Sequence, residues 1–315
     1  MARFAFLAAI LLGLAIGPAA ATDRLSVVAT TGMIADAARQ VGGDLVEVEA
    51  LMGPGVDPHS YRQTRTDIVA MTRADLVLWH GLYLEAQLEE FLLQLGERQT
   101  VVAVAEALPR DVLVGHDDYD DKFDPHVWMD PELWTGVVTS VEAALSAAMP
   151  EAAETFAANA EAHLAEIAEL TEYAAGVLAT VPAEQRVLVT AHDAFNYFGR
   201  AYDFEVVGIQ GISTEGEAGL ARIREIVDIL VEREVAAVFV ESSVSDRNIR
   251  ALIEGADARG HDVDVGGELF SDAMGEPGTY EGTYIGMIDH NATTIARALG
   301  GEAPAGGMRD LLAED

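Results

Sequence analysis

The chain has 315 residues, no cysteine and a formal net charge of −34. Without cysteine it cannot form disulfides, zinc–thiolate sites or cysteine-ligated iron–sulfur clusters, so a strong metal site must use His, Asp and Glu. The negative charge repels nucleic acid and anionic membranes, and we expect neither as a partner. An acid-biased proteome explains this bulk charge better than metal binding does, so the charge alone does not indicate a metal site.

The first residues have the layout of a cleavable secretory signal peptide. Arg3 gives a positive start, Phe4 to Ile16 form an apolar core, and residues 19–21 offer an Ala-x-Ala cleavage site. The apolar core is shorter than the ~20 residues that a membrane-spanning helix needs. We therefore expect export to the periplasm and a mature chain that begins near Thr22. Because there is no cysteine to carry a lipid, we expect that chain to have no lipid anchor.

After this segment, short β-branched runs alternate with helical patterns, which is typical of an α/β fold with mostly parallel sheets. The predicted strands are Leu25–Ala29, Val46–Leu51, Leu76–Trp79, Val101–Val104, Val187–Thr190, Glu205–Gly208, Ala237–Val240 and Asp262–Val265. The predicted helices are Met33–Val41, Thr66–Met71, Leu84–Leu95, Ala194–Ala201, Glu217–Glu232, Asp246–Arg259 and Thr283–Leu299.

Between the two halves, apolar residues recur at helical spacing from Pro150 to Thr180. The pattern predicts one helix of about 30 residues and ~45 Å, at 1.5 Å per residue. So long a helix rarely lies inside one compact domain, so we expect it to join two lobes. The predicted parts are a signal peptide at 1–21, an N-terminal lobe at 22–148, the linker helix at 149–181 and a C-terminal lobe at 182–315.

Four residues with metal-binding side chains lie in loops next to predicted strands. His59 and His126 each follow Asp-Pro in the first half, whereas His192 and Asp272 follow strands in the second half. Ligands gather at the carboxyl ends of parallel strands, so a cleft between the lobes could bring all four together. Three imidazoles and a carboxylate suit a d-block divalent ion. The spacing alone leaves open whether these are ligands or ordinary hydrogen-bonding loop residues.

The motifs around these residues resemble those of a known family. They are Gly-Val-Asp-Pro-His-Ser-Tyr at 55–61, Phe-Asp-Pro-His-Val-Trp-Met-Asp at 123–130, Thr-Ala-His-Asp-Ala-Phe-Asn-Tyr-Phe at 190–198, Gly-Ile-Ser-Thr-Glu at 211–215 and Glu-Leu-Phe-Ser-Asp-Ala at 268–273. Together, and in this order, they resemble the zinc- and manganese-binding solute-binding proteins of ABC importers. The resemblance covers about residues 24–300.

This resemblance implies two (β/α) lobes joined by one long rigid helix, with the metal held between them. It implies His59 and His126 as the ligands from the first lobe, and His192 and Asp272 as those from the second. It also implies a partner, the permease of a metal ABC importer, and we expect the chain to act as a monomer that is not an enzyme.

The choice between Zn²⁺ and Mn²⁺ stays open at this point. Some manganese-binding members have Glu at the third ligand position, so His192 favours zinc. Many zinc-binding members carry a long His-rich loop before the second histidine, whereas the acidic segment His116–Lys122 contains one histidine. A zinc-dependent hydrolase and a binder of a metal chelate or corrinoid are the alternative functions.

The other residues with possible roles are assigned to packing or to support of the ligands. Asp193 and Glu241 are candidates for orienting the ligand imidazoles. The remaining histidines are expected to be structural: His80 as a hydrogen-bonding loop residue, His163 exposed or packed on the linker helix, and His261 and His290 outside the site. The three tryptophans are expected to pack the first lobe. We also expect the Gly-rich segment Ser271–Tyr284 to become ordered when metal binds.

Overall fold

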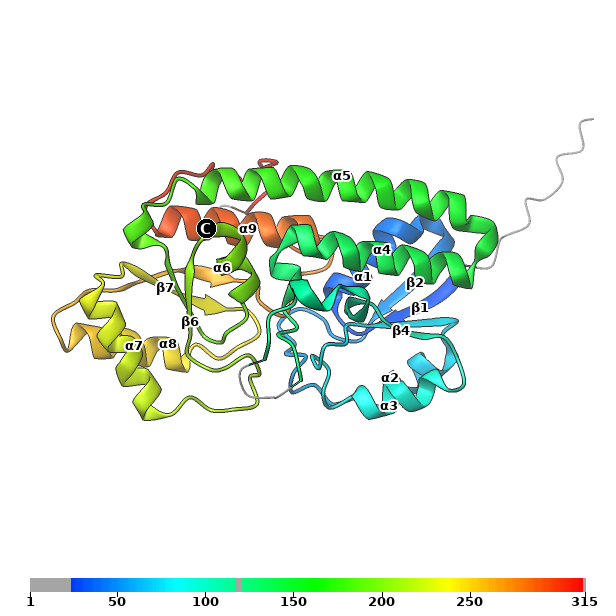
Figure 1. Cartoon of the computed structure of the whole chain (residues 1–315), viewed down its shortest axis with the longest axis horizontal. Coiled ribbons are helices and arrows are strands. Elements are labelled where there is room, and N and C mark those ends of the chain that lie inside the picture. The colour runs from blue at the N-terminus through cyan, green and yellow to red at the C-terminus, as the bar shows by residue number, and fades with distance from the viewer. Residues whose placement is uncertain (1–23, 117–120, 314–315) are drawn as a thin grey trace, which may run out of the picture.

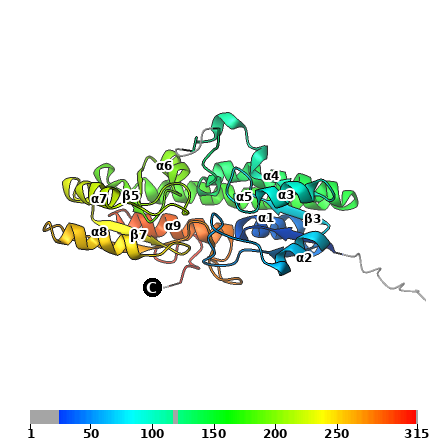
Figure 2. The same ribbon diagram turned by 90° about the horizontal axis from the view of Figure 1, so that it is seen from below.

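The computed structural model describes residues 24–116 and 121–313, so the predicted signal peptide lies outside the described residues. Two α/β lobes lie end to end along the long axis of the molecule, and α5 runs across both (Figures 1 and 2). Within the described ranges, we find no helix that combines the length and the apolar character needed to cross a membrane.

The first lobe contains a parallel sheet of four strands in the order β2-β1-β3-β4. The strands are β1 (Leu25–Ala29), β2 (Val46–Ala50), β3 (Leu76–Trp79) and β4 (Val101–Ala103). The helices of this lobe are α1 (Gly32–Gly42), α2 (Arg65–Arg73), α3 (Glu89–Gly96) and α4 (Pro131–Ala148). Alternate residues of the central strands face opposite helix layers. Val28 and Val77 pack with α2 and α3, whereas Val27 and Leu76 pack with α1 and α4.

The second lobe repeats this arrangement with two pairs of parallel strands, β5-β6 and β7-β8, in which β5 lies beside β7. The strands are β5 (Val187–Thr190), β6 (Glu205–Gly208), β7 (Ala237–Glu241) and β8 (Asp264–Leu269). The helices are α6 (Asn196–Tyr202), α7 (Leu220–Glu232), α8 (Arg247–Asp257) and α9 (Tyr284–Ala298). Val187 packs with α7 and α8, whereas its neighbour Leu188 faces the side of α9.

The long helix α5 covers Ala153–Leu178 and follows a 3₁₀ turn at Pro150–Ala152. It packs against α1 and α4 of the first lobe and against α9 of the second (Figure 1). Its buried residues belong to one apolar core that also includes α1, α4 and α9. The lobes therefore share a core along α5, which stiffens the connection between them. The lobe boundaries at 148/149 and 181/182 stay predictions.

Most predicted elements agree with the structure to within a few residues, and two differ. The helix predicted at 84–95 begins only at Glu89, because Gly81, Leu82 and Tyr83 have positive φ and form turns. The strand predicted at 262–265 runs from Asp264 to Leu269. It passes through a bulge at Gly266, where a Cβ would lie 2.7 Å from the Phe239 ring.

Helix α4 was absent from the prediction altogether. It has 18 residues, begins with Pro131 at its first turn, and is capped by the Asp130 side chain, which accepts from the Glu132 N–H. Asp followed by Pro is a good start for a helix, because Asp accepts from the free N–H groups and Pro needs no hydrogen-bond acceptor there. In this chain, the Asp130-Pro131 start signal directly follows the motif that contains His126.

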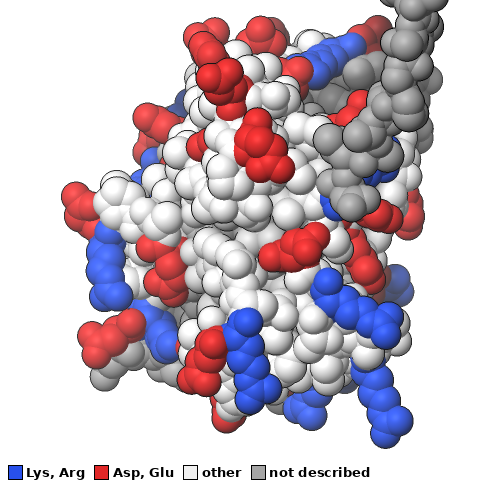
Figure 3. Space-filling model, turned by 90° about the vertical axis from the view of Figure 1, so that its right-hand side faces the viewer, with Lys and Arg blue, Asp and Glu red and all other residues white. Residues whose placement is uncertain are grey.

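The end of the first lobe carries side chains of both charges. Figure 3 shows the end of the first lobe, where basic and acidic side chains are interspersed despite the net charge of −34. This face is therefore not a uniformly acidic surface.

Candidate metal centre

The two histidines of the first lobe are held by the motif in which they occur. In each Asp-Pro-His segment, the aspartate Oδ1 accepts the backbone N–H of the histidine, at 2.9 Å for Asp57 and His59 and 3.0 Å for Asp124 and His126. Proline fixes the φ angle between them. The Asp124 Oδ1 also lies 2.7 Å from His126 Nδ1, which turns Nε2 of that ring toward the cleft.

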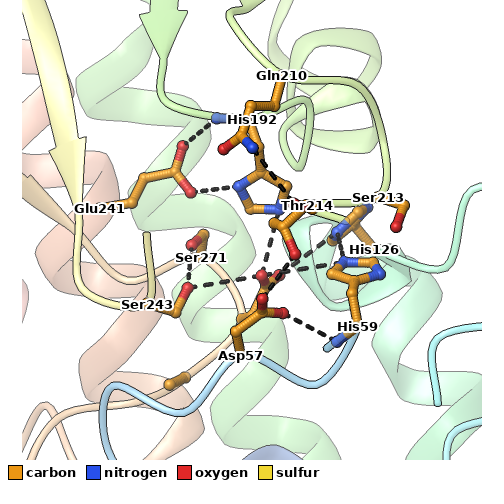
Figure 4. Close-up of polar contacts among 12 residues, drawn as sticks. Asp57, His59, His126, His192, Gln210, Ser213, Thr214, Glu241, Ser243 and Ser271 are labelled. Atoms are coloured by element: carbon orange, nitrogen blue, oxygen red, sulfur yellow. Dashed lines mark hydrogen bonds and ion pairs between the residues drawn. The ribbon is translucent and has the colours of Figure 1, made fainter. Parts of the chain in front are cut away.

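His192 directly follows β5 and is held by a residue from the neighbouring strand. The Glu241 Oε1 accepts its backbone N–H at 2.8 Å, and Oε2 lies 2.5 Å from its Nδ1. Glu241 ends β7, next to β5, so the sheet aligns the two groups. Figure 4 shows Glu241 bridging the backbone and ring of His192. Glu241 therefore makes the direct contacts with His192 that the predicted orienting role requires.

Asp272 follows β8 and completes the group. Its Oδ2 lies 3.2 Å from His192 Nε2 and 3.9 Å from His59 Nε2, and its Oδ1 lies 3.4 Å from His126 Nε2. The Ser243 hydroxyl is 3.5 Å from Oδ2 and 3.0 Å from the Ser271 hydroxyl.

The four side chains could hold one metal ion. One ligand atom from each lies within 4.8 Å of all the others. Zinc–nitrogen bonds of about 2.0–2.1 Å in a tetrahedron place ligand atoms about 3.3 Å apart. His59 Nε2 and His126 Nε2 are 3.2 Å apart, close to that value. His192 Nε2 and Asp272 Oδ1 are buried without a hydrogen-bond partner among the described residues, as expected of atoms that face a metal.

The pKa values of two of the three ligand imidazoles are raised by neighbouring carboxylates, whereas that of the third is lowered by burial. Burial lowers the pKa of His59 to about 4. Burial also opposes charge on His126, but the Asp124 and Asp272 carboxylates outweigh it and raise its pKa to about 9. Burial likewise opposes charge on His192, but Asp272 and then Glu241 raise its pKa well above the usual value. Despite burial, the imidazoles, first His192, hold the pKa of Asp272 well below its usual range.

The other candidates have varied roles. His80 is buried, and its Nε2 lies 2.7 Å from the Pro125 carbonyl, so it supports the second motif as a loop residue. His163 is buried against α1 rather than exposed. His261 and His290 contact backbone carbonyls outside the cluster. Asp193, the other proposed orienting residue, has a buried Oδ1 without a hydrogen-bond partner among the described residues and no bond to a ligand.

The supporting contacts of Asp57, Asp124 and Trp128 were not predicted from the sequence. Asp124 orients His126, and its repetition of the Asp-Pro-His pattern at Asp57 could have revealed it. Trp128, expected to pack only the first lobe, donates its indole N–H to the Ser271 carbonyl of the second lobe at 2.8 Å. Tyr284 of α9 donates in turn to the Trp128 carbonyl at 2.9 Å. No local sequence signal predicts these contacts between lobes.

Comparison with known proteins identifies the family. The family described as "Zinc-uptake complex component A periplasmic" matches residues 27–298. The chain belongs to this family. It is 48% identical over 279 residues to the "Manganese-binding lipoprotein MntA" of Bacillus subtilis (strain 168), covering 89% of this chain and 91% of that protein. It is 44% identical over 281 residues to the "Zinc-binding protein TroA" of Treponema pallidum (strain Nichols), with 89% and 91% covered.

Structural comparison gives the same family. The periplasmic zinc-binding protein TroA from Treponema pallidum superimposes with a TM-score of 0.85 at 44% identity, covering 88% of this chain and 99% of that one. A further relative, 29% identical over 283 residues, is the "Manganese ABC transporter substrate-binding lipoprotein PsaA" of Streptococcus pneumoniae serotype 4 (strain ATCC BAA-334 / TIGR4), with 88% of this chain and 90% of that protein covered. The predicted α/β fold and membership among metal-binding solute-binding proteins are confirmed.

One expectation about location is corrected. The names of the relatives from B. subtilis and S. pneumoniae call both proteins lipoproteins, which contradicts the expectation of a mature chain without a lipid anchor. That expectation had a single ground, the absence of cysteine from the sequence. The expectation of a location outside the cytoplasmic membrane stands.

Proposed function

We propose that this chain binds one zinc or manganese ion as cargo and delivers it to the permease of an ABC importer. The proposed ligands are His59, His126, His192 and Asp272. The observation that carries this proposal is the meeting of four buried ligand atoms, two of which have no hydrogen-bond partner among the described residues. Both lobes contribute ligands from a single chain, which supports action as a monomer.

The donor set bears on the metal. Three imidazole nitrogens and one carboxylate suit zinc, and such a site binds Zn²⁺ more tightly than Mn²⁺ in vitro. Relatives with nearly equal identity are named for manganese and for zinc. Affinity alone therefore does not identify the cargo. Elemental analysis of protein purified from its native periplasm, together with competition titrations, decides it.

A transport role fits better than hydrolysis. A catalytic zinc site has three protein ligands and keeps one position for water, whereas this chain offers four protein ligands that are at most 3% exposed. We therefore propose that the chain is not an enzyme. Hydrolytic assays of the metal-loaded protein are expected to show no turnover. The alternative of a chelate or corrinoid binder has no support in a cluster this compact.

The ligand assignment is tested with the variants His59→Ala and Asp272→Ala. Each removes one of four ligands, so we expect calorimetry to show at least about a 100-fold loss of Zn²⁺ and Mn²⁺ affinity, above the 10–100-fold typical of supporting residues. His261→Ala is the control, because its Nε2 lies 2.9 Å from the Val235 carbonyl, outside the cluster. Unchanged affinity in both ligand variants would refute the assignment.

A further inference from the structure

The segment between β6 and α7 contacts the first lobe across the mouth of the cleft. We call residues 210–217 the strap. Thr214 donates its hydroxyl to Asp57 Oδ2 at 2.6 Å, and Gln87 donates to the Glu215 carboxylate at 2.8 Å. Within the strap, the Gln210 side chain donates to the carbonyls of Thr214 and Gly216, so these residues are held as one unit. Figure 4 shows Gln210 and Thr214 beside the ligand imidazoles.

The contact made by Thr214 leads directly to a ligand. Asp57 uses Oδ1 to accept the His59 backbone N–H and Oδ2 to accept the Thr214 hydroxyl. A side chain of the second lobe therefore holds the carboxylate that positions a ligand of the first lobe. The same oxygen also accepts the Ser60 hydroxyl at 2.8 Å, from within the first lobe. One oxygen thus receives one bond inside its lobe and one between lobes.

Two hollows approach the cluster, and they differ in chemistry. One, of about 420 Å³, reaches Asp272 but is lined largely by apolar residues such as Met52, Pro54 and Met274. The other, of about 240 Å³, has a largely polar lining that includes Asp57, Thr214, Glu217 and Ser243, together with the cationic side chain of Arg247. A hydrated cation loses less solvation in the polar hollow. The Ser243 hydroxyl, which lines it, is only 3.5 Å from Asp272 Oδ2.

The strap contacts are also the more accessible links between the lobes. The contacts of Trp128 with Ser271 and Tyr284 are fully buried, whereas the Thr214–Asp57 bond is partly buried and the Gln87–Glu215 bond is exposed. Figure 1 shows the chain that leads into α7 on the side of the molecule opposite α5. The strap can therefore separate from the first lobe while the shared core along α5 stays intact.

We propose that the strap controls exchange of the metal through the polar hollow, with Thr214 as the positioning residue that holds His59 through Asp57. This inference rests on the proposed function, because it needs a metal at the four ligands. While the bond from Thr214 to Asp57 is made, the strap keeps the cluster closed and both lobes' ligands together. When the bond is broken, the strap can move away from the first lobe, and Asp57, which supports His59, keeps its bond from Ser60 but loses its link to the second lobe.

The test compares three variants by stopped-flow transfer of zinc from the loaded protein to a chelator in excess. Thr214→Val keeps the shape of the side chain and loses the hydroxyl, so we expect zinc release about 10- to 100-fold faster, as for loss of one hydrogen bond to a charged group. Thr214→Ser keeps the hydroxyl and is expected to restore slow release. Ser60→Ala removes the bond within the lobe to the same Asp57 oxygen but leaves the link between the lobes intact, so it is expected to speed release much less than Thr214→Val does.

A fourth variant, at a different residue, guards against a local folding defect at Thr214. Gln87→Ala removes the other strap contact from the first lobe, and it is expected to speed release in the same direction by a smaller factor. Wild-type release rates in Thr214→Val, or equal acceleration in Ser60→Ala, would overturn the role of the strap. Failure of the wild-type protein to bind either zinc or manganese would instead overturn the proposed function, so the two failures are distinguishable.

Discussion

The two lobes contribute two ligands each but orient them in different ways. In the first lobe, His126 is positioned by Asp124, two residues before it in the chain. In the second lobe, His192 is positioned by Glu241, 49 residues later and on another strand. One lobe therefore carries the support for a ligand inside a short motif, and the other obtains it from the alignment of neighbouring strands.

This difference has a physical consequence for how the ligands are fixed. A hydrogen bond between residues of one short motif, as between Asp124 and His126, forms as soon as the loop adopts its turn, because the proline already restricts the backbone. A support from another strand exists only after the sheet is assembled. The geometry of the second lobe's ligands therefore depends more strongly on the folded state, and the predictions below test this contrast.

Among the residues that orient ligands, the largest expected effect on metal affinity distinguishes Glu241 from Asp124. In Glu241→Gln, the amide replaces one of two oxygens that each accept a bond from His192, so one bond is lost. In Asp124→Asn, a single oxygen, Oδ1, accepts both bonds from His126, so the amide oxygen can keep both, and the bond that is lost is the one that Asn196 donates to Oδ2. Calorimetry should show a loss of zinc affinity of about 10- to 100-fold for Glu241→Gln and clearly less for Asp124→Asn. A loss at Asp124 equal to or greater than that at Glu241 would refute the contrast.

A second prediction concerns pH. His126 and His192 have raised pKa values in the metal-free protein, that of His126 at about 9, whereas His59 is neutral at pH 7. A metal must displace the protons that the first two imidazoles hold, so apparent affinity should rise as pH increases toward 9 and fall as pH decreases. Calorimetry in buffers of different ionisation enthalpy should detect about two protons released per ion at pH 7. Binding without proton release would contradict the assigned charges.

A third prediction concerns the contact between the lobes and is measured as stability rather than as metal affinity. Trp128 and Trp134 are both fully buried, but only the Trp128 indole N–H has a hydrogen-bond partner among the described residues. Trp128→Phe leaves the Ser271 carbonyl without that donor, so it should lower the free energy of unfolding by about 1–3 kcal/mol more than Trp134→Phe does. Chemical denaturation of both variants measures the difference. Equal losses would show that the indole bond contributes nothing between the lobes.

Much of the fold could be predicted because its signals are local. The apolar runs at Leu76–Trp79 and Val187–Thr190 gave strands with the observed bounds, since strands buried on both faces are continuous in sequence. The prediction of β8 failed because glycine occurs both in turns and at close contacts within strands. The predicted strand ends at Val265, yet β8 continues through Gly266, where the Phe239 ring packs in the place that a side chain would occupy.

The sequence by itself determined the class of fold, the family resemblance and the identity of the four candidate ligands. Residue types and short motifs carry these, as in Asp-Pro-His at His59 and His126. Only the tertiary structure decided how the ligands are held: the bond of Glu241 to His192, the pKa that divides His126 from His59, and the bond from Thr214 to Asp57. The two bonds join groups far apart in sequence, and both pKa values depend on burial and on Asp272 of the other lobe, so they are fixed only when the lobes pack together.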